Sequence, residues 1–399
     1  MIPVKTKVNM LHLFLGLLAV MPLIDSVNGI LLRNSIRLMN IGQIYRITIL
    51  FCLISMINRV RRQQAEVLLV SFMLLLLVQL CISWDYGISN TLVCFKLFIP
   101  IFMMYVLKGL LDKKIITFER FSNVIERISL LTPLTIIIPY IGGMGYHTYD
   151  SWAGYRGFYF ATNEISFTVS SCIMYLILRL SDDIEVKYVI LLVLNILGSL
   201  LIGTKSLLAV AAASIFLLIL SFLRRKEGGK SKRIGAVAVI SVAAIGGTVM
   251  FKDSLHAVYM RWLYGRQQNP DTSILFFLTS GRTSRIEGAW KAFHEGSLIQ
   301  ILFGWGLAGA NNGRPNTEMD YFDLLFAVGW IGFIILMILY LLFLRHIKTN
   351  FWTIPLLGLI FILVFAGGHV LYAGLGGMMY ALIMVYLAQY SQVKQDERC

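Results

Sequence analysis

Long apolar runs recur along the whole chain, with short polar segments between them. Each run is close to the ~20 residues that an α-helix needs to cross a bilayer. The first run is followed by Asp25 and Asn28 and has no small-residue cleavage site, so we interpret it as a span and not as a cleaved signal. The pattern predicts an all-α, polytopic membrane protein with about twelve transmembrane helices, at residues 8–24, 42–57, 65–84, 91–111, 122–141, 161–180, 188–204, 206–223, 234–251, 322–344, 351–370 and 372–390.

The composition supports this class. Of the 399 residues, 58% are hydrophobic and 14% are charged, and the mean hydropathy is +0.76. A soluble domain of this size could not bury so much apolar surface. The net charge of +14 does not indicate nucleic acid, because basic residues of a membrane protein set its orientation and meet anionic lipids or substrates. Four of the five cysteines lie in apolar runs and the fifth ends the chain, so we predict no disulfide framework and no metal site.

Basic clusters set the predicted orientation. They lie at residues 59–62, 108–114, 224–233 and 345–348. If the densest cluster, 224–233, is cytoplasmic and the chain crosses twelve times, all four clusters fall on the cytoplasmic side. Both termini are then expected in the cytoplasm as well.

This topology predicts three ranges: residues 1–251 with nine spans, a large outer loop at 252–321, and residues 322–399 with three spans and a short tail. The outer loop has room for a small folded unit. Its segment RTSRIEGAWKAF has apolar residues at the spacing of one helix face, and Thr279 or Ser280 can cap the start of that helix. The apolar residues are Ile286, Ala289, Trp290 and Phe293.

Basic residues also lie on the predicted outer side, where few are expected. Arg282 and Arg285 are three residues apart and share a face in the first turn of the predicted helix, where backbone N–H groups favour an anion. Lys205 interrupts an apolar sequence and would be costly if it faced lipid. We therefore expect an anionic ligand outside. In the alternative, the arginines contact lipid phosphates or pair with nearby acids, and Lys205 lies at the outer interface with its amine in water.

Four stretches together resemble the family of bacterial O-antigen ligases and O-antigen or capsule polymerases. They are YRGFYFATNEIS at 155–166, GTKSLLA at 203–209, SGRTSRIEGAW followed by ILFGWGLAG at 280–309, and EMDYFDLLFAVGWIGF at 318–333. Their order and their expected place at the outer face carry the resemblance over the C-terminal part of the chain.

The resemblance implies a GT-C-like, multi-span glycosyltransferase of the bacterial cytoplasmic membrane that uses a glycan on undecaprenyl diphosphate as donor. It implies no cofactor and no metal, because arginines can neutralise the diphosphate leaving group. Lys205 and Arg282 match basic positions of the family, although lysine loses the bidentate geometry of arginine. A chain-length regulator and a flippase are further partners that it suggests. We expect diphosphate contacts from Lys205, Arg282, Arg285, Arg156 and Arg314, and glycan contacts from Asn163, Tyr321 and Trp290.

One departure from the family pattern bears on function. Ligases of the family have a histidine where this chain has Glu318, whereas Tyr321 and Gly329 fit the spacing that follows. The acidic start EMD resembles the polymerase branch, so Glu318 or Asp320 is predicted as general base for a sugar hydroxyl. The alternative is that both acids only pair with Arg314 or Arg282. We interpret His369, which follows two glycines, as a helix-packing or pore-facing residue.

Three functions stay open from the sequence. The first is a polymerase that joins lipid-linked repeat units. The second is an O-antigen ligase with lipid A core as acceptor, against which the missing histidine argues. The third is a transporter or flippase for a lipid-linked sugar, but transporters usually have related halves, and no internal repeat is visible here.

Overall fold

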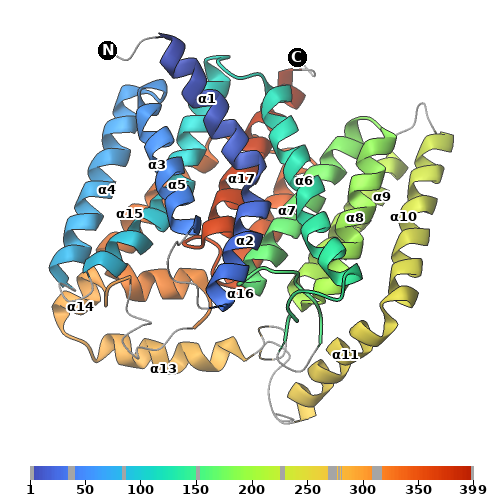
Figure 1. Ribbon diagram of the computed structural model, residues 1–399. Helices are drawn as coiled ribbons and strands as arrows, with labels where there is room; N and C mark the ends of the chain where they lie inside the picture. The colour runs from blue at the N-terminus through green and yellow to red at the C-terminus, as the bar shows by residue number, and fades with distance from the viewer. Residues whose placement is uncertain are drawn as a thin grey trace. The chain divides into compact units, whose positions relative to one another are not determined.

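The computed structural model describes residues 4–34, 41–82, 87–149, 153–224, 230–267, 276, 279, 281–307 and 317–396. Within these residues the chain forms sixteen α-helices, one short 3-10 helix and no β-strand (Figure 1). A single isolated bridge joins His147 and Tyr155. The predicted all-α class is therefore confirmed.

Seven helices are long and apolar enough to cross a membrane, or eight if a bent pair counts as one span. The polytopic class is confirmed, and each predicted run overlaps a helix, but the number twelve stays a prediction because α3 (Ile41–Ser55), α8 (Val186–Ile202) and α16 (Thr353–Gly367) are short. The seven lie in α4 (Arg62–Ile82), α5 (Gly87–Asp112), α6 (Phe118–Ile141), α7 (Thr162–Asp182), α9 (Lys205–Arg224), α10 (Lys230–Met250) and α15 (Asp320–Leu344).

The first predicted run is wrong in its extent. The chain forms α1 (Val4–Ala19) and α2 (Met21–Arg33), bent by 62° at Val20. Proline lies in the first turn of α2, where its missing N–H is tolerated. Helix α2 continues beyond residue 24 because its polar residues Asp25 and Asn28 are buried against protein. A hydropathy run ends at the first polar residue, whereas a helix can continue when that residue faces a polar partner: the Asn28 side chain accepts a hydrogen bond from the Gly42 N–H at 3.0 Å.

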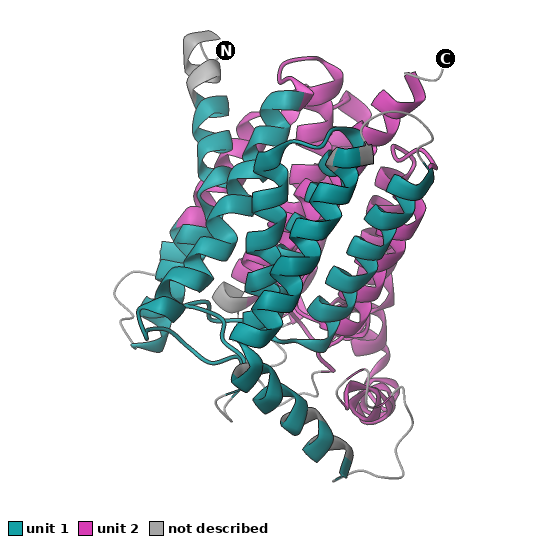
Figure 2. Cartoon of the chain, turned by 90° about the vertical axis from the view of Figure 1, so that its right-hand side faces the viewer, with its two compact units in different colours: residues 1–44, 119–271 teal, residues 45–118, 272–399 magenta. Residues whose placement is uncertain are grey.

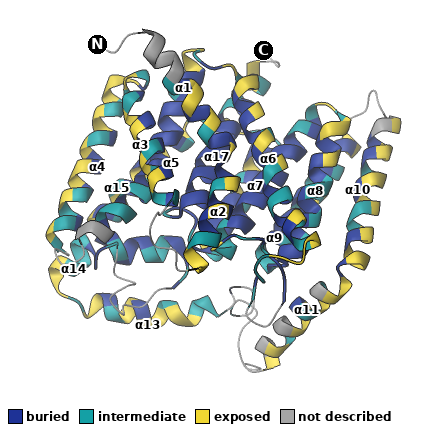
Figure 3. Ribbon diagram, in the orientation of Figure 1, coloured by how far each residue is buried: buried dark blue, intermediate teal, exposed yellow. Residues whose placement is uncertain are grey.

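The chain divides into two compact units (Figure 2), which cut across the predicted ranges: residues 1–44 with 119–271, and residues 45–118 with 272–399. In unit 1, α7 packs against α8 and α9, and α10 packs against α8. Helix α7 is almost entirely buried, whereas α10 exposes most of its apolar residues (Figure 3). Apolar exposure of this kind is expected of a helix at a lipid surface.

In unit 2, α17 (Gly374–Asp396) packs along α5 and is buried over most of its length. Helix α4 packs on the same α5, and α15 contacts α16. The Tyr105 hydroxyl of α5 donates to the Leu339 carbonyl of α15 at 2.8 Å. These contacts fix α15, whose N-terminal end carries the predicted acids.

The segment predicted as the outer loop holds α11 (Lys252–Gln267), α13 (Arg282–His294) and α14 (Leu298–Phe303). Helix α13 lies crosswise to the long helices of unit 2 (Figure 1). The apolar face predicted for it is confirmed in part: Ala289 and Phe293 are fully buried in a cluster with Trp305, Leu325 and Phe326, whereas Trp290 is 38% exposed. Burying a phenylalanine side chain contributes about 1.5–3 kcal/mol to the stability of the fold. The burial of Phe293 therefore stabilises the packing of α13 on α15.

The predicted cap of α13 is wrong. Its N-cap is Gly281, with φ of 80° and no side-chain cap, and Ser280 lies outside the described residues. The Thr279 hydroxyl instead contacts the Phe276 carbonyl at 3.3 Å. Glycine takes this left-handed conformation without a Cβ penalty. The next helix has the capping box that α13 lacks, with Ser297 and Gln300 bonding each other's backbone N–H groups.

Candidate functional site

The predicted site residues fall into the two units. Unit 1 holds Arg156, Asn163 and Lys205. Arg314 lies outside the described residues. Unit 2 holds the larger set, which consists of Arg282, Arg285, Trp290, Glu318, Asp320 and Tyr321.

Glu318 joins both predicted arginines. Arg285 Nη1 donates to Glu318 Oε1 at 2.7 Å, and Arg282 Nε donates to Oε2 at 3.3 Å. Arg282 also donates to the Ala366 carbonyl at the end of α16. The Arg282 side chain is 13% exposed, whereas those of Arg285 and Glu318 are 49% and 36% exposed. The arrangement is a charged cluster of one acid and two arginines with one side open to solvent.

These contacts decide the charge of Glu318. Partial burial raises the pKa of the Glu318 carboxyl. The hydrogen bond from Arg285 and the charges of Arg285, Arg282 and His369 together lower this pKa by more than burial raises it, so it lies below its ordinary value. Glu318 is therefore a carboxylate at neutral pH. In this ion-paired arrangement it is a weak base.

The backbone around Glu318 is unusual. Glu318 and His369 have φ of 57° and 58°, in the left-handed region that non-glycine residues rarely adopt. Gly368, with φ of 62°, lies so close to the Glu318 carbonyl that a Cβ there would overlap it. A left-handed non-glycine residue costs about 1–2 kcal/mol. Two such residues, Glu318 and His369, lie where the segment before α15 contacts the segment after α16.

Two aspartates hold these segments in place. Asp320 Oδ2 accepts from the N–H groups of Val370 and Leu371 at 2.7 and 2.8 Å. Asp323 Oδ1 accepts from the N–H and the hydroxyl of Thr317, both at 2.8 Å. Asp320 is fully buried. It is therefore enclosed by protein, unlike Glu318.

The two C-terminal motif stretches bind each other. Gly329 breaks α15, with φ of 66° and ψ of 179°. The carbonyls of Phe326 and Ala327 accept from the N–H groups of Trp305 and Gly306 at 2.8 and 3.0 Å. A Cβ on Gly304 or Gly329 would collide with the facing backbone, which explains the glycines in both stretches.

The predicted glycan residues of unit 2 lie on α13 and α15, the helices next to the charged cluster of Glu318, Arg282 and Arg285. Trp290 belongs to α13 and is 38% exposed, and its ring lies 4.5 Å from that of His294. Tyr321 follows Asp320 directly, and its ring lies 6.3 Å from that of Phe365. An exposed tryptophan face can stack on a sugar ring, so Trp290 remains suited to this role.

The two N-terminal motif stretches also bind each other, within unit 1. The Tyr155 N–H donates to the Leu201 carbonyl at 2.7 Å, and the Ser166 and Thr204 hydroxyls lie 3.0 Å apart. Gly203, with φ of 67°, ends α8, and Lys205 begins α9. The Arg156 guanidinium donates to the Thr162 hydroxyl at 2.9 Å, beside Asn163. Both cations are partly buried, Lys205 at the start of α9 and Arg156 in the segment before α7.

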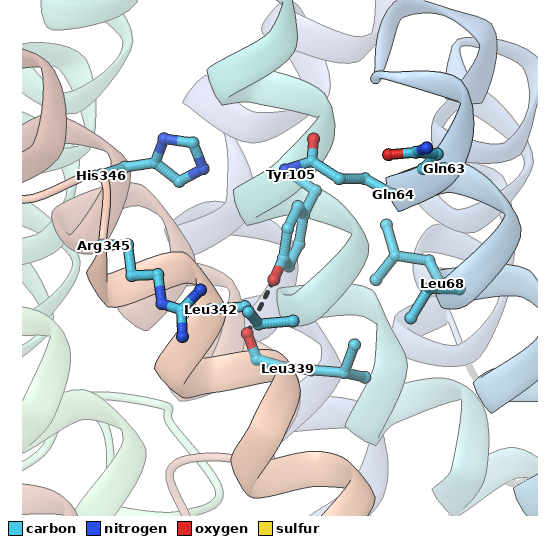
Figure 4. A pocket seen from close by; sticks show the side chains of 9 residues that line it. Gln63, Gln64, Leu68, Tyr105, Leu339, Leu342, Arg345 and His346 are labelled. Atoms are coloured by element: carbon cyan, nitrogen blue, oxygen red, sulfur yellow. Dashed lines mark hydrogen bonds between the residues drawn. The ribbon is translucent and has the colours of Figure 1, made fainter.

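A cavity of about 290 Å³ lies in unit 2 at the opposite end of α15 (Figure 4). Arg345 and His346 lie on one side of it, Gln63 and Gln64 on the other, and Tyr105 between them. Leucine and valine side chains complete its wall. None of the predicted site residues lines this cavity.

Sequence reasoning missed three polar residues beside Glu318. The pattern does not single out Asp323 or Tyr372, and it indicates only a helix-packing or pore-facing residue at His369. The signal was present in GGHVLY, where a histidine and a tyrosine interrupt two apolar runs. Among the described residues, no group of three or more histidine, cysteine, aspartate or glutamate side chains could hold a metal ion.

Comparison with known proteins identifies one similarity. A family model described as O-antigen ligase like membrane protein matches residues 5–258, well over half of the chain. The match includes the stretches at 155–166 and 203–209 and ends before the two stretches of unit 2. Neither a curated protein nor a solved structure matches the chain.

Proposed function

The chain belongs to the family of O-antigen ligase like membrane proteins, and from this premise we propose that it is a polysaccharide polymerase. It joins undecaprenyl-diphosphate-linked oligosaccharide repeat units into O-antigen or capsular polysaccharide. The reaction takes place at the outer face of the bacterial cytoplasmic membrane, with both termini of the chain in the cytoplasm. The family association with glycosyltransfer on lipid-linked glycans supports the reaction class, and the site supports the finer assignment.

The observation that carries the proposal is the pairing of Arg282 and Arg285 with Glu318. Two guanidinium groups that converge on one carboxylate can also bind the oxygens of a diphosphate, because arginine offers several N–H donors in a planar fork. Diphosphate carries more negative charge than a carboxylate and would compete with Glu318 for both arginines. Arg156, Lys205 and Arg314 are the further cations that we propose as diphosphate ligands.

The chemistry that follows is a displacement at the anomeric carbon. A sugar hydroxyl of one lipid-linked unit attacks the anomeric carbon of the growing chain. The bond between that carbon and the diphosphate oxygen breaks, and the diphosphate leaves with the electron pair. The arginines stabilise the charge that develops on the leaving group, the kind of preorganised electrostatic stabilisation that lowers the barrier in many enzymes. Asn163, Tyr321 and Trp290 are proposed to hold the sugars.

The two predicted acids receive different roles. Glu318 is partly exposed and can reach a substrate hydroxyl, but its lowered pKa makes it a weak base while the arginines hold it. Its carboxylate remains negative when the arginines move onto a diphosphate. Asp320 is fully buried and bonded to two backbone N–H groups, so we propose that it positions the loop after α16.

Glu318 also favours polymerase over ligase. The family's ligases have histidine at this position, and a carboxylate held by two arginines is chemically distinct from it. A transporter is disfavoured because the charged cluster lies beside the start of α15 and not in the middle of a span.

The test is the length of the surface glycan in a strain that lacks the gene. Complementation with the wild-type gene should restore long chains, and Arg282→Ala should leave a single repeat unit on lipid A core while the protein still reaches the membrane. Arg345→Ala, at the other end of α15, is the matched control and should restore long chains. Bare core together with accumulated long lipid-linked chains would identify a ligase instead.

A further inference from the structure

A chain of three polar side chains runs from α15 to the loop after α16. His369 Nδ1 lies 3.0 Å from the Tyr372 hydroxyl. The same hydroxyl donates to Asp323 Oδ2 at 3.3 Å. Each of these three side chains is partly buried, so protein contacts order them. The His369 side chain retains access to solvent.

The direction of the hydrogen bonds fixes the tautomer of His369. A tyrosine hydroxyl has one proton, and Tyr372 gives it to the Asp323 carboxylate, which can only accept. The Tyr372 oxygen must therefore accept from His369, so Nδ1 carries the proton. In the neutral imidazole Nε2 then has a free lone pair. This is the form of histidine that can take a proton from a substrate.

The imidazole is placed at the charged cluster by the backbone. Gly368 packs directly against the Glu318 carbonyl, and His369 follows it. Asp323 binds both sides of Glu318, because Oδ1 accepts from the Thr317 N–H and Oδ2 accepts from the Met319 N–H at 3.2 Å. The same aspartate thus positions Glu318 and, through Tyr372, His369. The arginines also reach this point, since Arg282 donates to Ala366 three residues before His369.

We propose that His369 is the general base of the transfer, an assignment that rests on the polymerase function proposed above. Nε2 takes the proton of the attacking sugar hydroxyl while its oxygen bonds to the anomeric carbon, and the electron pair of the broken bond leaves with the undecaprenyl diphosphate. Asp323 and Tyr372 are positioning residues that hold Nδ1–H. The Glu318 carboxylate stabilises the imidazolium that forms.

The surroundings favour a histidine that gains a proton during the reaction. Negative groups come from the segment before α15 and from α15 itself. Positive groups come from α13, and the Arg46 guanidinium of α3 lies against Gly374, at the start of α17. When the arginines bind the diphosphate, the carboxylates remain to stabilise the imidazolium. The groups concerned are Glu318, Asp320, Asp323, Tyr372, Arg282 and Arg285.

The test uses the full-length protein in liposomes with lipid-linked repeat units as substrate. His369→Asn is the first variant, because asparagine tolerates the left-handed backbone of this position while it lacks the imidazole. We expect a rate about 10²–10⁴-fold below wild type, the usual contribution of general base catalysis. The fall of the wild-type rate on the acid side of its pH profile should disappear as well. His346→Gln, in the cavity at the other end of α15, is the matched histidine control and should keep the wild-type rate and profile.

Two further measurements make the result specific. Added imidazole should restore part of the activity of His369→Gly, because glycine tolerates the left-handed backbone and imidazole replaces the missing base. Tyr372→Phe should keep the base but lose its orientation, with a rate about tenfold lower and the acid limb retained. A His369→Asn protein with wild-type rate and pH profile would overturn the assignment and leave the polymerase function intact. A wild-type protein that forms no polymer would overturn both.

Discussion

Arginine and histidine lie at both ends of α15, but their partners differ between the two ends. At the start, Arg282 and Arg285 meet the Glu318 carboxylate, and His369 is held by Tyr372. At the end, Arg345 and His346 line a cavity whose lining includes no carboxylate. Burial lowers the pKa of His346, and neighbouring Lys108 lowers it further, so that this histidine is neutral at neutral pH.

The comparison shows that the cavity alone does not identify the reactive end. The residues that line the cavity include Arg345 and no carboxylate. The start of α15, in contrast, has charges of both signs, left-handed backbone and a hydrogen-bonded histidine. Strained backbone tends to occur at functional sites. The proposed reaction therefore belongs to the start of α15, and variants at the two ends should behave differently.

The largest difference is expected for the arginines. Replacing both Arg282 and Arg285 with alanine should lower the polymerisation rate by about 10²–10³-fold or more, the loss seen when one preorganised donor to a developing oxyanion is removed. Arg345→Ala should leave the rate unchanged. Initial rates from purified proteins in liposomes check this, and equal losses at both ends would remove the distinction between them.

Asp320 should affect stability more than chemistry. Asp320→Ala leaves the N–H groups of Val370 and Leu371 without their partner in a buried site, at a cost of about 1–3 kcal/mol. We expect a lower midpoint of thermal unfolding, with residual activity in the folded fraction. An Asp320→Ala protein of normal stability and no activity would show instead that this carboxylate takes part in the reaction.

Glu318→Gln should have a smaller, pH-dependent effect on stability. The pKa of Glu318 is lowered from its ordinary 4.5, so its ion pairs stabilise the protein above that value and the stabilisation is lost as pH falls through the lower, folded-state pKa. The side chain is partly exposed, so the effect at neutral pH should be under about 1 kcal/mol. Unfolding midpoints of the two proteins should differ at pH 7 and converge in acid. A constant difference at all pH values would mean that the ion pairs do not cause it.

The smallest effect is expected from the cavity. Leu342→Trp would fill part of it without touching the charged cluster, so the transfer rate should stay near that of wild type. Leu342 is at the surface of the bundle, and its replacement should not overpack the core. A strong loss of activity in this variant would link the two ends of α15 and contradict the separation drawn between them.

Helix positions could be predicted from the sequence because lipid-facing runs are apolar over a length that the bilayer sets. The end of α2 could not, because Asp25 and Asn28 lie on a buried helix face that only tertiary contacts define. The face of α13 could be predicted from its spacing, but not its cap, since the left-handed turn at Gly281 replaces a side-chain cap.

The site was predictable to the same extent. Arg282 and Glu318 stood out as charges in motif stretches, but their ion pair depends on a fold that joins residues 36 positions apart. His369 could not be assigned a role from spacing alone, because its partner Tyr372 is held in turn by Asp323, which lies on α15. Contacts between loops of different helices are not encoded in local periodicity.

The polymerase function is tested most directly by polymerisation with the purified protein alone. Wild-type protein in liposomes receives undecaprenyl-diphosphate-linked repeat units, and the products are separated by size. We expect a ladder of longer chains with release of undecaprenyl diphosphate, and no ladder when Arg282 and Arg285 are both alanine. Wild-type protein that forms no ladder but transfers a preformed glycan to lipid A core would contradict the polymerase function.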